Sequence, residues 1–494
     1  MKTAAVIGAG FGGLALAIRL QSAGVQTTLF EARDKPGGRA YVYEDAGFIF
    51  DAGPTIITDP SSVEELFALS GRKLSDYVEL MPITPFYRLC WEDGYSFDYV
   101  NEQDELDRQI RAKSPSDVAG YQRFLAYSRE LLQEGYVKLG AVPFLSFASM
   151  IGAGPALLKL QAWKSVYTKV AEFIKDEQLR QAFSFHSLLV GGNPFATSAI
   201  YALIHALERK WGVWFARGGT GALVQAMVKL FEDLGGVIHL NTPVAAIEAE
   251  GDRVTGVRLG GGEVLAFDAV ASNADVVNTY KKLLSGHPRG RSHGKTLTGK
   301  RHSMSLFVIY FGLKTQHPNL AHHTVLFGPR YRELISEIFN GPELSKDFSL
   351  YLHAPTRSDP TLAPPGCEAF YVLAPVPHLG SADLDWDVVG PVYRDRILAY
   401  LEERYIPGLT ADLVTCRIFT PFDFRDQLDA HLGSAFSLEP ILTQSAWFRA
   451  HNRDDVIKNL YIVGAGTHPG AGVPGVIGSA KATASLMLED VAAA

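Results

Sequence analysis

The first forty residues constrain this chain more than any other stretch. A short buried strand is predicted up to Gly8, followed by the turn Gly8-Ala-Gly10-Phe-Gly12-Gly13 and a helix over about residues 12–23. A second predicted strand, residues 25–30, ends on Glu31. A strand, a glycine turn, a helix, a second strand and an acid, in this order, form the dinucleotide-binding fingerprint. The sequence therefore predicts an α/β domain that binds a nucleotide.

Each residue of this fingerprint has its own expected role. Gly8 permits the tight turn, and Gly10 lets the backbone approach a pyrophosphate. Gly12 lies at the helix start, whose N-terminus is expected to face the phosphates, and Gly13 allows close packing of helix on strand. Glu31 is expected to accept hydrogen bonds from a ribose diol.

A second group of motifs follows the acid. The chain continues Ala32-Arg33-Asp-Lys-Pro-Gly37-Gly38-Arg39 and then Phe50-Asp51-Ala-Gly53-Pro54-Thr55. These motifs resemble the flavoprotein family of amine oxidases, protoporphyrinogen oxidases and carotenoid desaturases, in which Gly-Gly-Arg follows the acid and its arginine contacts the flavin pyrophosphate. The resemblance implies FAD, because an extended FAD needs a second phosphate clamp and arginine offers a planar fork of donors. The alternative is a surface loop with a stray arginine.

Composition and charge exclude some classes of function. A length of 494 residues leaves room for two or three domains, and a net charge of −7 implies no general affinity for nucleic acid. Cys90, Cys367 and Cys416 are far apart, which indicates reduced thiols in a cytosolic protein. No metal is expected: His322 and His323 are adjacent, so their side chains should diverge on a strand or helix.

Residues 139–158 form an uncharged run of membrane-span length between Lys138 and Lys159. Prolines and glycines interrupt it, which argues against a spanning helix. Two interpretations stay open. The run is either a buried core segment, or an exposed apolar surface that enters one leaflet with Lys159, Trp163 and Lys164 near the headgroups.

Residues 181–207 form a second run without Asp, Glu, Lys or Arg, interrupted by Gly191-Gly192-Asn193-Pro194. Its apolar residues either line a cavity or form ordinary core: Phe183, Phe185, Leu188, Leu189, Phe195, Ile200, Tyr201, Leu203 and Ile204. His186 and His205 lie inside the run and Glu208 just beyond it. These three are weak catalytic candidates, because a lone buried histidine is more often a satisfied core residue, and no general base is assigned.

Residues 287–302 hold five Lys or Arg, three His and no acid, and their glycines predict a loop. This loop is either solvated or in contact with an anionic membrane surface.

The chain ends on a second glycine motif. A strand over residues 459–463 leads into Gly464-Ala-Gly466-Thr-His-Pro-Gly470-Ala-Gly472-Val473-Pro474-Gly475 and a helix. The N-terminus of that helix can face the flavin pyrimidine carbonyl, where its dipole would stabilise negative charge. The family resemblance further implies that the backbone near Val244 contacts the adenine.

Several motifs make the resemblance more specific. The similarity is to bacterial-type phytoene desaturases and extends over essentially the whole chain. It is carried by the glycine motif of residues 464–475, by Gly191-Gly192-Asn193-Pro194-Phe195, and by the stretch from residues 420–424 through 433–434 to 448–449. The resemblance implies FAD as sole redox cofactor and stepwise conversion of phytoene to lycopene with a cis-to-trans change. It also implies peripheral work on the cytoplasmic side of the cell membrane. The electron acceptor, oxygen or a quinone, stays open, as do the number of desaturation steps and the oligomeric state.

The expected fold class is α/β: a discontinuous Rossmann-type FAD-binding domain with an inserted mixed-sheet substrate domain and a helical membrane-associated subdomain. The FAD-binding domain is predicted over residues 1–80, 211–285 and 441–494, the substrate domain over 81–135 and 286–440, and the helical subdomain over 136–210.

Two other functions are alternatives for a chain with these motifs. An amine-type oxidase would need polar or aromatic groups to hold a nitrogen, and none is identified in the sequence. A non-catalytic escort protein for prenylated lipids on the same scaffold would need no working flavin site, which the intact loop from Gly466 to Gly475 argues against. A yellow colour from bound FAD would separate the desaturase from the escort protein.

Overall fold

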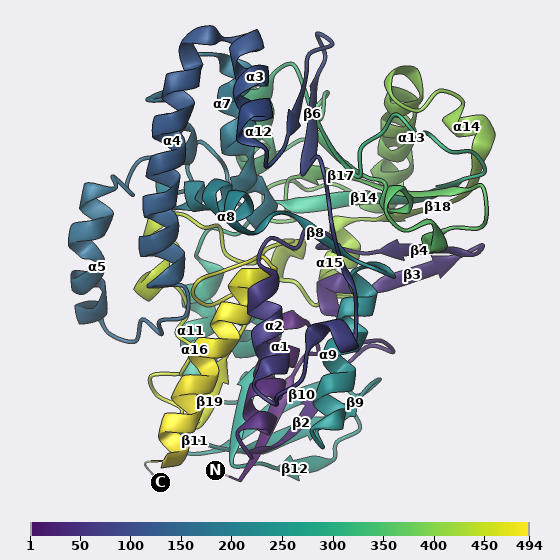
Figure 1. Cartoon of the computed structure of the whole chain (residues 1–494). Helices are drawn as coiled ribbons and strands as arrows, with labels where there is room; N and C mark the ends of the chain where they lie inside the picture. The colour runs from purple at the N-terminus through teal and green to yellow at the C-terminus, as the bar shows by residue number, and fades with distance from the viewer. Residues whose placement is uncertain (1, 493–494) are drawn as a thin grey trace.

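The computed structural model describes residues 2–492 of the chain. Figure 1 shows a parallel sheet with both termini at the bottom, a larger sheet at the top, and a group of helices beside it. This arrangement confirms the predicted α/β fold with a Rossmann-type part and a mixed-sheet part.

The Rossmann-type part is built on a five-stranded sheet in the order β19-β13-β1-β2-β9, in which every pairing is parallel. Its strands are β1 (Thr3–Ile7), β2 (Gln26–Phe30), β9 (Val237–His239), β13 (Ala269–Ser272) and β19 (Leu460–Ile462). Three distant segments of the chain supply these strands, so the domain is discontinuous, as predicted.

Alternation along β1 explains how both faces of this sheet are covered. Ala4 and Val6 pack into one hydrophobic cluster, and Ala5 and Ile7 pack into another on the opposite face. The first cluster includes residues of α1 (Phe11–Ser22), α2 (Pro60–Ala68), α9 (Gly219–Asp233) and α16 (Val473–Ala492). The second includes residues of β10 (Val244–Glu250), β11 (Arg253–Leu259), α10 (Val276–Asn278) and α11 (Pro288–Thr298). β12 (Val264–Ala266) completes an antiparallel sheet with β10 and β11.

The second sheet has seven strands in the order β18-β14-β17-β16-β15-β6-β7. Only the β15–β6 pairing is parallel, so the sheet is mixed, as predicted. Its strands are β6 (Tyr87–Trp91), β7 (Ser96–Tyr99), β14 (Ser305–Leu313), β15 (His323–Phe327), β16 (Leu350–His353), β17 (Glu368–Val376) and β18 (Leu413–Phe419). One face packs on α13 (Trp386–Arg404), and the other belongs to the large core that surrounds the cavity.

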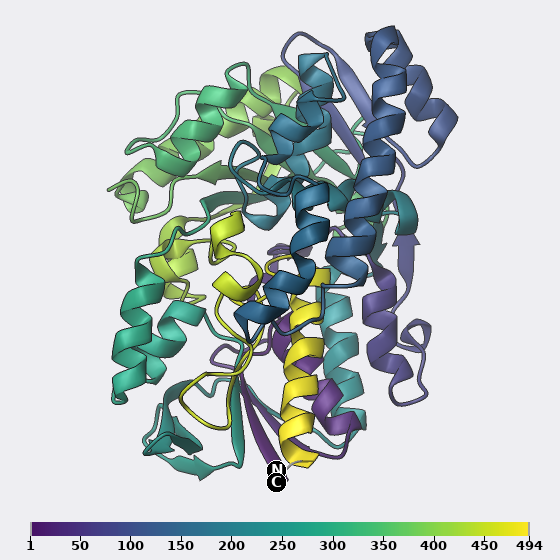
Figure 2. The ribbon, with the colours of Figure 1, turned by 90° about the vertical axis from the view of Figure 1, so that its left-hand side faces the viewer.

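Helices lie beside this second sheet and beside α16 (Figures 1 and 2). They are α3 (Gln103–Lys113), α4 (Val118–Leu131), α5 (Phe147–Lys159), α6 (Val166–Ala171), α7 (Glu177–Ser184), α8 (Leu203–Trp211) and α12 (Tyr331–Asn340). The remaining short elements are β3 (Val42–Asp45), β4 (Phe48–Asp51), β5 (Leu80–Pro82), β8 (Trp214–Ala216), α14 (Leu409–Asp412) and α15 (Pro421–Asp426). Among the described residues, no helix combines the length and apolarity needed to cross a membrane.

The prediction of a loop over residues 287–302 is wrong, because most of this segment forms the helix α11. Two of its glycines are packing residues: a Cβ at Gly290 would lie 1.9 Å from the Leu284 carbonyl oxygen, and one at Gly294 would lie 2.9 Å from the Lys281 side chain. The helix therefore needs glycine on its inner face, against residues 281–284, and the glycines do not signal flexibility there.

The contact between α1 and β1 is made by backbone. A Cβ at Gly13 would lie 2.0 Å from the Gly8 carbonyl oxygen, and Gly8 itself has a φ of +94°. No larger residue fits at position 13 unless the helix moves away from the strand.

We expect Gly13→Ala to destabilise the fold, because the added methyl group meets a backbone atom and overpacking of this kind typically costs about 1–3 kcal/mol. Gly261→Ala is the matched control, since a Cβ at Gly261 meets no heavy atom within 4 Å and its φ is not positive. The midpoint of urea unfolding, followed by circular dichroism, should fall for Gly13→Ala alone. Equal midpoints for both variants would contradict this account of the packing.

Candidate functional site

A cavity of about 840 Å³ is lined by residues of both sheets and of the helices between them. Fifteen of the seventeen residues predicted to bind the cofactor line this cavity: Gly8, Gly10, Gly12, Glu31, Ala32, Arg33, Gly38, Arg39, Gly53, Pro54, Thr55, Val244, Gly466, Val473 and Pro474. The three chain segments that build the Rossmann-type sheet thus supply one continuous binding surface.

Gly13 and Gly464 are the two predicted residues that do not line the cavity. Gly13 packs against Gly8, as described above. Gly464 has a φ of +100°, and a Cβ there would lie 2.4 Å from Asn273 Oδ1. Asn273 also donates from Nδ2 to the Gly8 carbonyl oxygen at 3.3 Å, so it joins both glycine loops.

The first turn of α1 offers free donors. The N-cap is Gly10, which has no side chain to cap the helix, and the first turn carries no acid. The amides that an N-terminal turn leaves unpaired are therefore available to an anion.

Arg39 places a cation at the same end of the cavity. Its Nη2 donates to the Ser434 carbonyl oxygen at 3.3 Å, while its buried Nε has no hydrogen-bond partner among the described residues. Burial lowers the pKa of Arg39, and the nearby Asp275 only partly offsets that effect. A guanidinium in this state is stabilised by an added anion, so the donor set fits a pyrophosphate.

Glu31 holds the first turn in shape. Its Oε2 accepts from the Ala9 amide at 2.8 Å, and its Oε1 accepts from the Arg33 amide at 3.0 Å. The carboxylate is buried and lines the cavity, which is the position predicted for an acid that meets a ribose. Its part in fixing the loop backbone was not foreseen.

Asp51 fixes the start of α9 beside the Gly53–Thr55 segment. Its carboxylate accepts from the amides of Thr220 at 2.9 Å and Gly221 at 3.1 Å. Burial raises the pKa of Asp51 to about 6, although these amide hydrogen bonds act in the opposite direction. This acid therefore attaches one wall of the cavity to the Rossmann-type part.

Arg449 supports the second glycine loop. The side chain is buried, and its Nη2 donates to the carbonyl oxygens of Ala465 at 2.7 Å and Leu438 at 3.1 Å. Burial lowers the pKa of Arg449, and the nearby Tyr201 only partly offsets that effect. A fixed positive charge thus lies behind the loop that leads into α16. The sequence singled out Arg449 only as part of a motif.

Apolar side chains line the other end of the cavity. From the second uncharged run these are Phe185, Leu188, Leu189, Ile200, Tyr201, Leu203 and Ile204, so the cavity alternative holds for them, whereas Phe183 and Phe195 do not line the cavity. The first uncharged run adds Leu139, Phe144, Met150 and Leu157, and the seven-stranded sheet adds Leu306, Val308, Val325 and Phe327. Residues of both uncharged runs therefore line the same cavity.

The structure brings the three catalytic candidates close together, with the His186 and His205 ring centroids 6.3 Å apart. Glu208 lines the cavity, but Tyr87 donates to its Oε1 at 2.6 Å, and His186 Nε2 lies 3.0 Å from its Oε2. His186 and His205 do not line the cavity. The His205 ring lies between the hydroxyl groups of Tyr99 and Tyr121, and burial holds the pKa of His205 well below its usual value.

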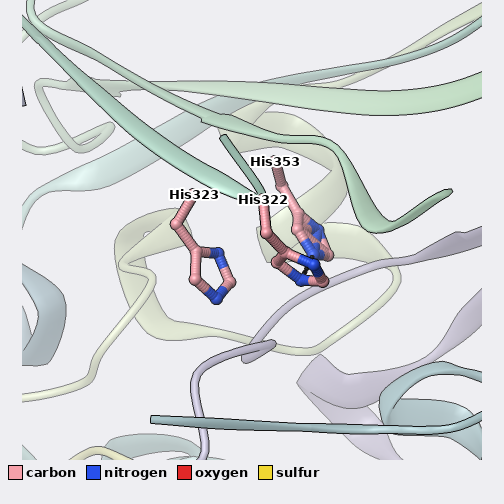
Figure 3. Close-up of side chains that lie close together, drawn as sticks. All are labelled: His322, His323 and His353. Atoms are coloured by element: carbon pink, nitrogen blue, oxygen red, sulfur yellow. Dashed lines mark hydrogen bonds between the residues drawn. The ribbon is translucent and has the colours of Figure 1, made fainter. Parts of the chain in front are cut away.

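The expectation that His322 and His323 diverge is wrong. Their ring centroids lie 4.4 Å apart, and a ring nitrogen of each lies within 4.8 Å of one on His353 (Figure 3). The alternation rule fails because His322 lies just before β15, while His323 is paired with His353 across β15 and β16.

Comparisons with known proteins agree with this site. The family model described as "Flavin containing amine oxidoreductase" matches residues 11–488. The chain is 68% identical to "Phytoene desaturase (lycopene-forming)" from Pseudescherichia vulneris and to the protein of the same description from Pantoea ananas, in each case over 99% of this chain and 100% of the relative. Cyclohexylamine oxidase from Brevibacterium oxydans shares the fold, with a TM-score of 0.64, 17% identity and 99% of both chains covered.

The chain therefore belongs to the flavin-containing amine oxidoreductase family, and within it to the phytoene desaturases. Its cofactor is FAD, and the glycine loops, the amides at the start of α1 and the Arg39 guanidinium, whose Nε has no partner among the described residues, fit that group.

We expect Gly10→Val to abolish FAD binding, because its side chain fills space that the pyrophosphate needs: a Cβ there already lies 3.1 Å from Asn273 Nδ2. Arg39→Ala should raise the Kd of FAD about ten- to a hundredfold, the loss expected for one charge-assisted hydrogen bond. Flavin absorbance per protein and calorimetric titration measure both effects.

Arg88→Ala is the control for Arg39→Ala, since Arg88 pairs with Asp98 and does not line the cavity. Stoichiometric flavin in purified Gly10→Val, or equal Kd values for Arg39→Ala and Arg88→Ala, would show that the cofactor lies elsewhere.

Proposed function

We propose that this protein desaturates phytoene stepwise to lycopene, with a cis-to-trans change along the polyene, and that FAD is its sole redox cofactor. The observation that carries the proposal is that one cavity joins the cofactor end to a long apolar end. The 68% identity to lycopene-forming phytoene desaturases over the full chain supports the same substrate.

The cofactor end offers a place for each part of FAD. The amides of the α1 N-terminus and Arg39 hold the pyrophosphate, Glu31 meets the adenosine ribose, and the backbone at Val244 meets the adenine. The start of α16 at Val473 and Pro474 meets the flavin, where the helix dipole favours negative charge. When bound, FAD supplies the hydride acceptor.

The apolar end suits a hydrocarbon that offers no polar handle. Leu188, Leu203 and Phe327 provide contact area, and recognition of phytoene rests on shape and positioning. Glu208 lines this end of the cavity; its Oε1 accepts from Tyr87, and its Oε2 lies 3.0 Å from His186 Nε2 without a hydrogen bond. The apolar lining as a whole favours a polyene over an amine.

The proposal is tested by incubating the FAD-loaded protein with phytoene in liposomes under air and recording the visible spectrum. Bands of a long conjugated polyene should appear, and Gly10→Val should give none. A yellow protein that leaves phytoene unchanged and oxidises amines would overturn the proposal.

We propose further that catalysis needs no single indispensable base. Loss of hydride from an allylic carbon leaves a delocalised cation, whose neighbouring C–H bond becomes acidic, so a weak acceptor is sufficient. A charged base in an apolar cavity would be costly to desolvate. Glu208, the candidate that lines the cavity, accepts from Tyr87 at Oε1, which fits a structural role for that oxygen.

Glu208→Gln, His186→Ala and His205→Ala are therefore expected to slow single-turnover reduction of the flavin by phytoene less than about tenfold, since general bases contribute about 10²–10⁴-fold. Stopped-flow absorbance of the flavin measures the rate. A loss within that range in one variant, with FAD and phytoene binding intact, would identify the base and refute the proposal.

We propose that α5 docks on the membrane and that the protein works peripherally, on the cytoplasmic side of the cell membrane. Phe147, Ile151 and Leu158 follow one another at helical spacing on its outer side and are 54%, 65% and 64% exposed. Met150 and Leu157 of the same helix line the cavity. Docking through α5 would bring the apolar end of the cavity to the lipid that dissolves phytoene.

Neighbouring residues extend this surface. Trp163 is 56% exposed just after α5, and Phe448 lies beside Trp447, whose ring is 5.3 Å from that of Phe147. Lys159 is the last residue of the helix, and its Nζ lies 3.1 Å from Glu130 Oε2. Phe144 is not part of this docking surface, because it is 4% exposed and its ring packs on His468.

Oxygen and quinones both dissolve in a bilayer, so a protein docked through α5 would meet either of them there as its electron acceptor.

We expect Phe147→Asp/Ile151→Asp to lose binding to anionic liposomes while keeping FAD, because two carboxylates replace buried apolar area at the interface. Val388→Asp/Val392→Asp is the matched control: both valines of α13 are similarly exposed, and Figure 1 places α13 away from α5. Co-sedimentation with liposomes measures binding. Equal sedimentation of both double variants would show that α5 is not the docking surface.

A further inference from the structure

Desaturation, the proposed function on which this inference rests, releases a proton inside the cavity. Each new C=C bond requires two C–H bonds to break. One hydrogen leaves with its electron pair, which reduces FAD, and the other leaves as a proton while its electron pair becomes the double bond. An apolar cavity stabilises a proton poorly, so the proton needs a route to water.

At one place in the cavity wall, polar side chains form a hydrogen-bonded path away from the cavity. Thr55 and Tyr351 line it, and their oxygens lie 3.2 Å apart. On its far side the Tyr351 hydroxyl lies 2.6 Å from His323 Nδ1, and the His323 ring is fully buried behind the cavity wall. The cavity is thereby connected to the histidine cluster of Figure 3.

The cluster continues with His353 and His322, whose rings lie on the same side of the strands as His323. His353 Nε2 lies 3.0 Å from His322 Nε2, and His322 Nδ1 lies 2.7 Å from Ser358 Oγ. Ser358 is half-buried and belongs to the loop that follows β16. The cluster thus reaches from the cavity wall to the molecular surface.

Each imidazole uses its two nitrogens on opposite sides. The series is Tyr351 to His323 Nδ1, His323 Nε2 to His353 Nδ1, His353 Nε2 to His322 Nε2, and His322 Nδ1 to Ser358. His323 Nε2 and His353 Nδ1 are the two nitrogens of this series without a hydrogen-bond partner, and their rings are stacked with centroids 5.2 Å apart. Because the rings are stacked, these two nitrogens are joined only if a water bridges them or one ring turns out of the stack.

We propose that Tyr351, His323, His353 and His322 form a proton relay that carries the proton released by desaturation from the cavity to the surface at Ser358. Each imidazole accepts a proton on one nitrogen and passes on the proton of the other, which is the property that suits histidine to a shuttle. Burial holds the pKa of all three histidines far below the usual value, so none of them retains the proton.

The same cluster has the residue type of a metal site, but its geometry favours a relay. His353 and His322 direct Nε2 at Nε2 across 3.0 Å, the separation of a hydrogen-bonded pair, in which one nitrogen carries a hydrogen and has no free lone pair. The cluster contains no carboxylate or thiolate among the described residues, so a divalent cation would be buried with its charge uncompensated.

The relay is tested in anaerobic single turnovers of the FAD-loaded protein with phytoene in phosphatidylcholine liposomes. Flavin absorbance and a pH-indicator dye are followed together, in weakly buffered H₂O and D₂O. In the wild type, the proton should appear in step with flavin bleaching and show a solvent isotope effect. In Tyr351→Phe and His353→Phe, its appearance should be slowed at least about tenfold.

Tyr371→Phe is the matched control. Its hydroxyl also reaches Thr55, at 2.7 Å, and it lines the same cavity, but it has no bond to His323. This variant should keep the wild-type solvent isotope effect. Wild-type proton release in Tyr351→Phe and His353→Phe, or equal slowing in Tyr371→Phe, would overturn the relay.

Two further results would also overturn it. A stoichiometric metal that copurifies with the wild type and is lost from His353→Phe would assign the three histidines as ligands. A wild-type flavin that phytoene never bleaches would remove the proposed function, and with it the proton that the relay carries.

Discussion

The structure depends on bringing a highly charged cofactor and an uncharged hydrocarbon into one cavity. Phosphate groups need cations and free amides, whereas a polyene needs a wall without exposed charge. The chain separates the two demands in space. Arg39, Glu31 and the start of α1 lie at one end, and the two uncharged runs lie at the other. Near the apolar end, the Glu208 carboxylate accepts from Tyr87 and lies beside His186.

Backbone packing makes the charged end possible. Because Gly13 lets α1 lie directly on Gly8, the helix N-terminus is aimed at the cavity, and Asn273 ties this turn to the loop at Gly464. These contacts join segments of the chain that are hundreds of residues apart. The cofactor end is therefore completed only when the first and last strands of the chain have paired with β13.

The apolar end is positioned by the second sheet and the helices beside it. β15 and β16 give one face to the cavity through Val325, Phe327 and Tyr351. α5 closes the cavity on the side of Met150 and Leu157 and still leaves Phe147 and Ile151 in solvent. A helix with two apolar sides is explained if one side meets substrate and the other meets lipid.

Local motifs could be predicted from the sequence, and contacts between distant segments could not. The glycine loops, Glu31 and Arg39 were found because their spacing along the chain carries their chemistry. The His322, His323 and His353 cluster was missed because it depends on the pairing of β15 with β16, which no local pattern records. The glycines of α11 predict a loop from the sequence, because their neighbours at Lys281 and Leu284 are brought to them only by the fold. Phe144 has the same character as Phe147, and only packing on His468 separates them.

A structure of the protein with FAD and phytoene both bound would test the shared cavity most directly. The account predicts FAD over Gly10 and Arg39, with the polyene beyond it between Leu188, Leu203 and Phe327, and a protein–lipid contact at α5 when the complex is embedded in a nanodisc. A polyene bound outside this cavity, or FAD that leaves Arg39 without a phosphate contact, would contradict the account.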